Sequence, residues 1–186
     1  SFKEIKEKAL NEEREIFDEI KNRVDLLIDQ EIVFKNPLER DGAQNSDHMY
    51  GTRAAEAALV YLILEDKKYL DLSKRVLSSV VDYYTLRNKH NLNIEWYAFS
   101  RINSLAAFDW IYNSLSEKER IEIGNPLLKA IHYMPLKERG DVFRRNTGDY
   151  KSGFYGPTIL PWYAGLVFYK TGINDSLSLN LLKQGY

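Results

Sequence analysis

Residues 52–65 read TRAAEAALVYLILE, and this stretch decides the fold class. Apolar residues occupy almost every position, so a helix formed here has apolar groups around nearly its whole circumference. Such a helix is stable in water only when other elements cover most of its sides. We therefore expect a buried helix over residues 52–65, with neighbouring helices that shield it.

Two kinds of helix alternate on the C-terminal side of this stretch. Residues 94–115 and about 158–171 are again apolar and aromatic, whereas residues 67–88 and the segment from Ser116 to Ile131 carry their apolar groups on one stripe. A final amphipathic piece is expected from about Asn174. No long stretch alternates with period two, so strands are not expected. The order predicts a series of helical hairpins, each with one buried and one amphipathic helix.

Local signals set the expected boundaries. Residues 116–119, SEKE, have the capping-box pattern of a helix start. Pro126 is expected to kink or divide the helix that follows, and residues 135–156, which contain four glycines, are expected to form a loop. On the N-terminal side, residues 1–36 are expected to form one long amphipathic helix that Pro37 ends.

The hairpins can stack into a solenoid or close into a toroid, with the buried helices on the inside. We expect an all-α fold in which helical hairpins over residues 50–186 form an incomplete (α/α) toroid. Residues 1–186 are then a single all-α domain, which we expect to be part of a larger protein. A plain helical bundle is the alternative.

Composition excludes several classes of function. The chain has 186 residues, with 26 Lys and Arg against 27 Asp and Glu, and this balance gives no field that attracts nucleic acid. No apolar run is long enough for a membrane span. Cysteine is absent, and the three histidines, at positions 48, 90 and 132, lack the spacing of metal ligands. No phosphate-binding or dinucleotide-binding motif is present, so neither a metal nor another cofactor is expected.

Aromatic residues make up 13% of the chain and gather near the expected starts of the buried helices. In a hairpin array these starts lie at one end of the fold. Sugar rings pack on aromatic faces that have hydrogen-bonding groups beside them. The candidate substrate-binding residues are Tyr50, Trp96, Tyr97 and Trp162, with Arg144 and Arg145 supplying positive charge. The expected partner is an acidic polysaccharide or oligosaccharide.

Residues 106–120, AAFDWIYNSLSEKER, resemble the segment A-Y-D-W-L-Y-x-x-L-S-x-x-E-R in the helical domain of heparinase II/III-like polysaccharide lyases. Residues 57–70, AALVYLILEDKKYL, are similar to a helix pair of the same family. The resemblance covers about residues 48–175. It implies cleavage of uronic-acid-containing polysaccharides by β-elimination, and a secreted or periplasmic location.

A lyase of this type neutralises the uronate carboxylate, removes the C5 proton and protonates the leaving oxygen. The resemblance implies that Tyr155 serves in proton transfer and that His48, or else His90, is a base. Asn146 or Arg101 would face the carboxylate. These residues complete the set of catalytic candidates.

Two other functions stay open at this point. A glycoside hydrolase on the same scaffold needs two carboxyl groups across a cleft, and Asp47, Glu95 and Asp149 are near the expected rim. The domain could instead bind carbohydrate, or another protein, without catalysis. Asp109 is flanked by apolar residues and is expected to be a buried structural acid bonded to a neighbouring helix.

Overall fold

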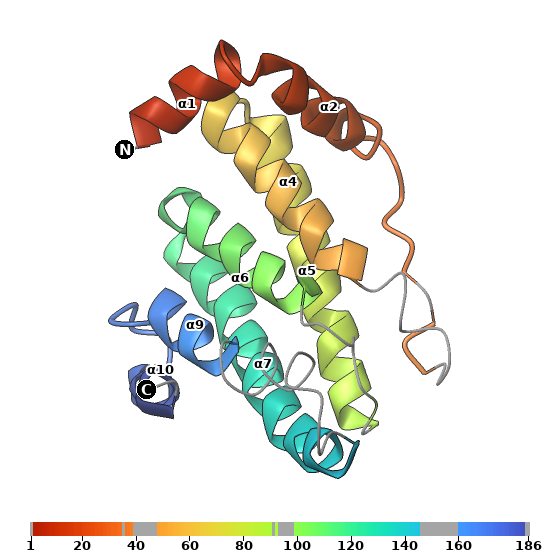
Figure 1. Ribbon diagram of the computed structural model, residues 1–186, viewed down its shortest axis with the longest axis vertical. Coiled ribbons are helices and arrows are strands. Elements are labelled where there is room, and N and C mark those ends of the chain that lie inside the picture. Colours follow the sequence, from red (N-terminus) through yellow and green to blue (C-terminus); the bar gives the residue numbers. More distant parts are fainter. Residues whose placement is uncertain are drawn as a thin grey trace.

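The computed structural model describes residues 2–34, 36–38, 48–90, 92, 99–145 and 160–184, of which 48, 49, 133–145 and 184 are described by their backbone alone. These residues contain helices and turns and no strand, which confirms the all-α class (Figure 1). The elements are α1 (Phe2–Leu10), α2 (Arg14–Asp25), α4 (His48–Leu64), α5 (Lys67–Lys89), α6 (Phe99–Ile111), the 3-10 helix η1 (Tyr112–Ser114), α7 (Glu117–Arg145), α9 (Leu160–Val167) and α10 (Asp175–Gln184).

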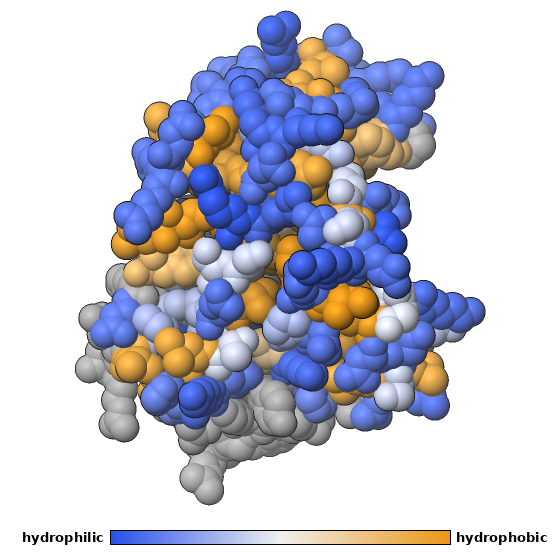
Figure 2. All heavy atoms as spheres, turned by 180° about the vertical axis from the view of Figure 1, so that it is seen from behind, coloured by the Kyte–Doolittle hydropathy of each residue, from blue (hydrophilic) through white to orange (hydrophobic). Residues whose placement is uncertain are grey.

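The expected alternation of buried and amphipathic helices is present. Helices α4, α6 and α9 lie side by side, while α5 packs on α4, α7 packs on α5 and α9, and α10 packs on α9 (Figure 1). The core lies around α4 and α6, because each of these helices carries fully buried residues on several of its sides. The face opposite to the view of Figure 1 is mainly hydrophilic, with separate hydrophobic patches (Figure 2).

Helices α4 and α6 run parallel, with their starts together. The Gly51 N–H donates to Ser100 Oγ at 2.9 Å, and Asn103 Nδ2 donates to Thr52 Oγ1 at 2.9 Å. At the other end, the Tyr61 hydroxyl lies 2.9 Å from the hydroxyl of Ser114.

Helix α9 runs in the same direction on the other side of α6. The rings of Phe108 and Phe168 stack with centroids 5.0 Å apart, which brings the ends of α6 and α9 together. The Tyr112 hydroxyl donates to the Thr171 carbonyl at 3.3 Å just beyond these ends. The starts of α4, α6 and α9 therefore face one side of the fold.

The first turns of α4 and α6 touch because position 51 has no side chain. A Cβ at Gly51 would lie 1.8 Å from the Ser100 carbonyl oxygen. Behind this contact, the Tyr84 hydroxyl lies 2.5 Å from Ser100 Oγ and 3.1 Å from Ser104 Oγ. All three hydroxyl-bearing residues are buried, so each hydroxyl needs these partners.

Two expected helix starts use side-chain caps. The Ser116 N–H donates to Glu119 Oε2 at 2.8 Å and the Glu119 N–H donates to Ser116 Oγ at 3.3 Å, which confirms the capping box. Asp66 accepts a hydrogen bond from the Lys68 N–H at 3.1 Å and so caps α5. The preceding residue, Glu65, has φ of 60° and turns the chain sharply between α4 and α5.

The prediction of one long helix over residues 1–36 is wrong. The helix is interrupted after Leu10, where Asn11 Nδ2 donates to the Glu7 carbonyl at 2.8 Å. Such a local bond competes with continued helix formation. Residues 11–15 are all polar, so no apolar stripe holds this stretch against the core.

Helix α7 starts where it was expected, but the prediction of a loop over residues 135–145 is wrong, and Pro126 does not divide the helix. The helix runs without division through Pro126 and extends to Arg145, so residues 135–145 are helical and do not form a loop. Proline at position 126 deprives the Glu122 carbonyl of its helical partner. Glu122 is exposed, and water can bond to that carbonyl. Leu127 and Leu128, which have no exposed surface, hold the helix on the core.

Candidate functional site

Helices α6 and α9 expose a row of large apolar side chains on their shared outer side. Trp162 and Leu166 lie on α9 and Tyr169 lies in the turn just after it. The three recur at spacings of four and three residues and so lie on one side. On α6, the exposed side chains are Phe99 and Trp110. We call these five residues the aromatic face.

Both halves of the aromatic face lie on sides of their helices that α7 does not cover. A Cβ at Gly124 of α7 would lie 2.7 Å from the Phe108 ring and 3.0 Å from the Phe168 ring, so α7 covers the side of α6 and α9 that carries both phenylalanines. Trp110 and Trp162, which are 38% and 36% exposed, lie on other sides of their helices. The aromatic face is consequently open to a ligand, while its helices are held from behind.

One acid and one phenol meet at the junction between α6 and α9. Asp109 is exposed, and Tyr163 is half-buried. Removal of water by the surrounding protein raises the pKa of the Asp109 carboxyl above its ordinary value, although the residue still reaches solvent. Desolvation, and after it the negative charge of Asp109, raise the pKa of the Tyr163 phenol. The junction therefore places a carboxyl whose ionisation is disfavoured beside a phenol that keeps its proton, and the phenol can donate a hydrogen bond.

The prediction for Asp109 was wrong. The residue is exposed, and within the part of the chain that the structure describes it makes no hydrogen bond or ion pair to a neighbouring helix. The cause is its position on α6, because Asp109 lies on the open side of that helix whereas its neighbour Phe108 is fully buried.

Four of the predicted site residues have described side chains. His90 is exposed at the C-terminal cap of α5. Trp162 is exposed on the aromatic face. Tyr50 is 4% exposed and its ring stacks on Phe34 with centroids 4.0 Å apart, so it has no open face for a sugar. Arg101 is 0% exposed in the first turn of α6, where a polysaccharide cannot reach it directly.

The other predicted site residues lie outside the described side chains. His48 begins α4, and Arg144 and Arg145 end α7, but only their backbones are described. Tyr155, Asn146, Trp96 and Tyr97 are outside the described residues, as are the three carboxyl groups considered for a hydrolase, Asp47, Glu95 and Asp149.

Among residues whose side chains the structure describes, no three His, Asp or Glu residues come together as metal ligands. Within the described residues, no helix combines the length and the apolarity that crossing a bilayer requires. No protein-family model, no curated protein and no solved structure matches the chain.

Sequence reasoning overlooked most of the aromatic face. The predicted sugar-binding residues lie near the helix starts, whereas Trp110 and Tyr169 lie near the helix ends. The spacing of Trp162, Leu166 and Tyr169 at four and three residues was the available signal, because a strongly apolar helix rarely needs an exposed stripe of this kind.

Proposed function

We propose that the protein is a carbohydrate-active domain that binds an acidic polysaccharide and cleaves it by β-elimination. The observation that carries the proposal is the aromatic face, which stands beside two hydrogen-bonding groups, the Asp109 carboxyl and the Tyr163 phenol. Exposed indole rings accept the C–H-rich faces of sugars.

The scaffold we propose is an incomplete (α/α) toroid. Parallel helices α4, α6 and α9 with antiparallel partners are the unit from which such a toroid is built. The aromatic face would then line part of the inner surface of the ring, where a polysaccharide chain can lie across several helices.

The reaction is assigned to residues near the starts of the inner helices. A base, Tyr155 or a histidine such as His48, takes the proton from C5. The electrons form the C4–C5 double bond as the C4–O bond breaks, and the leaving oxygen receives a proton from an acid. Asn146 neutralises the uronate carboxylate. Arg101 is fully buried, and its role is to position the first turn of α6 rather than to touch substrate.

The test is a turnover assay on heparan-type, chondroitin-type and alginate-type chains, followed by the ultraviolet absorbance of the unsaturated product. We expect absorbance with at least one polymer, its loss in Tyr155→Phe, and a raised KM in Trp162→Ala. Tyr61→Phe is the matched control, because that residue lies at the opposite end of α4. Absence of ultraviolet-absorbing product from every polymer would exclude β-elimination.

Hydrolysis is the second candidate, and Asp109 favours it. A general acid in a glycoside hydrolase needs a raised carboxyl pKa, and the direction found for Asp109 meets that need. In hydrolysis, new reducing ends form without ultraviolet absorbance, and Asp109→Asn abolishes them. If neither product forms but Trp162→Ala weakens sugar binding, the domain binds carbohydrate without catalysis.

A further inference from the structure

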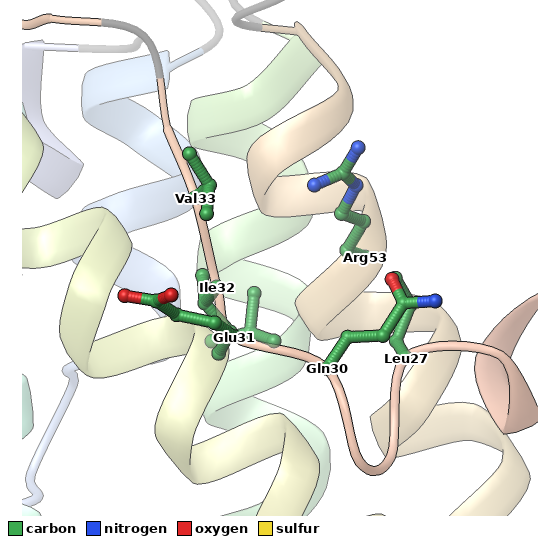
Figure 3. A pocket seen from close by; sticks show the side chains of 7 residues that line it. Leu27, Gln30, Glu31, Ile32, Val33 and Arg53 are labelled. Carbon is green, nitrogen blue, oxygen red and sulfur yellow. The ribbon is translucent and has the colours of Figure 1, made fainter.

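A pocket lies apart from the aromatic face, between helices α4 and α5 and the segment that follows α2 (Figure 3). Its volume is about 250 Å³. The lining residues are Leu27, Gln30, Glu31, Ile32, Val33, Arg53 and Val76. The pocket thus combines an apolar wall with a few polar groups, which is the usual composition of a small-molecule site.

Arg53 is the cation of this pocket. Its side chain is partly buried and makes no hydrogen bond or ion pair with any residue of the described ranges. Nearby arginines differ, because Arg23 Nη2 bonds Glu56 Oε1 at 2.7 Å and Arg75 bonds backbone carbonyls. In Figure 3 the Glu31 carboxylate points away from Arg53, on the other side of the segment. A partly buried guanidinium without a partner favours binding of an anion.

The wall opposite Arg53 is fixed before any ligand arrives. Arg75 Nη2 donates to the carbonyls of Leu27 and Ile28, at 3.2 and 2.6 Å, and so ties the turn after α2 to α5. A preformed wall lowers the entropic cost of binding. The neighbouring Ile32 packs against the hydrophobic core and holds the next part of the segment.

The pocket is separate from the proposed polysaccharide site. Gly51 faces α6, and Arg53 lies two residues further along α4, about 200° around the helix. Arg53 therefore points to the side of α4 that faces away from α6. A ligand bound here does not contact the aromatic face.

We propose that this pocket binds a small aliphatic carboxylate. The carboxylate pairs with the Arg53 guanidinium, which can donate two parallel hydrogen bonds to it. The alkyl chain lies against Leu27, Val33 and Val76. The volume equals that of about eight water molecules at ~30 Å³ each, so a six-carbon acid with about eight non-hydrogen atoms matches it in size.

The experiment is a titration of the isotopically labelled protein with hexanoate and, separately, with hexanol, followed by backbone amide shifts. Hexanol has the same chain length without the charge. We expect hexanoate to shift the amides of residues 27–33 and 53, and hexanol to bind at least tenfold more weakly. Arg53→Gln should weaken hexanoate binding at least tenfold, while Arg53→Lys should weaken it less.

The control variant is Arg14→Gln, which removes an exposed arginine of α2 that pairs with Asp18 outside the pocket. It should bind hexanoate as the unchanged protein does. Arg53 has no partner in the described structure, so Arg53→Gln should keep the far-ultraviolet circular dichroism spectrum of the unchanged protein. The proposal is overturned if hexanoate leaves residues 27–33 unshifted, if hexanol binds equally well, or if Arg53→Gln binds hexanoate undiminished.

Discussion

Replacement of Gly51 by alanine should destabilise the fold severely. The new Cβ would lie 1.8 Å from the Ser100 carbonyl oxygen and 2.6 Å from Ser104 Oγ. Both neighbours belong to α6, so α4 and α6 must separate at their starts. Overpacking of this kind costs about 1–3 kcal/mol. Separation also breaks hydrogen bonds of the buried hydroxyl cluster with Tyr84, at about 1–3 kcal/mol for each group left unpaired.

The higher helix propensity of alanine returns only about 1 kcal/mol. The net loss in the free energy of unfolding should therefore be about 2–4 kcal/mol. With a urea m-value of about 2 kcal/mol/M, the unfolding midpoint should fall by about 1–2 M. The assay is urea unfolding followed by far-ultraviolet circular dichroism.

Gly124→Ala is the matched control for this prediction. Gly124 is also within a helix, but its Cβ would meet the tips of side chains, with the Phe108 ring at 2.7 Å and Ile173 at 3.0 Å. Side-chain tips can move, so its loss should be about 1 kcal/mol or less after the gain in propensity. If Gly51→Ala unfolds within about 0.5 kcal/mol of the unchanged protein, the close contact between α4 and α6 does not exist.

Three further predictions concern charged and capping groups. The folded state raises the pKa of Asp109 above 3.8, so ionisation of this carboxyl disfavours folding. Asp109→Asn should therefore be more stable than the unchanged protein at pH 7 and should lose that advantage below pH 3.8. Urea unfolding at the two pH values measures the difference. Lys74 and the capping box lower the pKa of Glu119 from 4.5 to about 2. The ionised Glu119 therefore contributes fully to the free energy of unfolding above pH 4.5, and this contribution is lost as the pH falls towards 2. Glu119→Gln should remove this pH dependence. Ser116→Ala should lower thermal stability by about 1 kcal/mol through loss of the cap.

The all-α class and the alternation of helix types could be predicted because they depend on periodicity. Helix α4 has apolar groups all round, and no tertiary information is needed to conclude that it is buried. The capping box was equally predictable, since Ser116 and Glu119 are close in sequence and their two hydrogen bonds are local.

The failures have tertiary causes. The division of the N-terminal helix depends on Asn11 bonding its own backbone, and the continuity of α7 through Pro126 depends on packing against α5. Tyr50 was assigned to a sugar site because of its place before a helix, but its ring is covered by Phe34 and by Tyr83, whose ring centroid lies 5.3 Å away. The segment that carries Phe34 is separated from Tyr50 by 16 positions, and sequence patterns do not show that they meet.

The pocket at Arg53 could not have been found from the sequence. It requires that the segment after α2 lie beside both α4 and α5, and Arg75 holds it there through backbone carbonyls. Backbone acceptors carry no signature in the sequence. A lone arginine in an apolar helix gives no sign of whether it has a partner.

The most direct measurement is a titration of the labelled protein with a uronate-containing tetrasaccharide, followed by the indole N–H signals of Trp110 and Trp162. Both indole signals should shift together and saturate at the same concentration, while the amides on the exposed side of α5 should stay unchanged. Shifts confined to α5, or unchanged indole signals at saturating tetrasaccharide, would contradict the claim that the side shared by α6 and α9 binds carbohydrate.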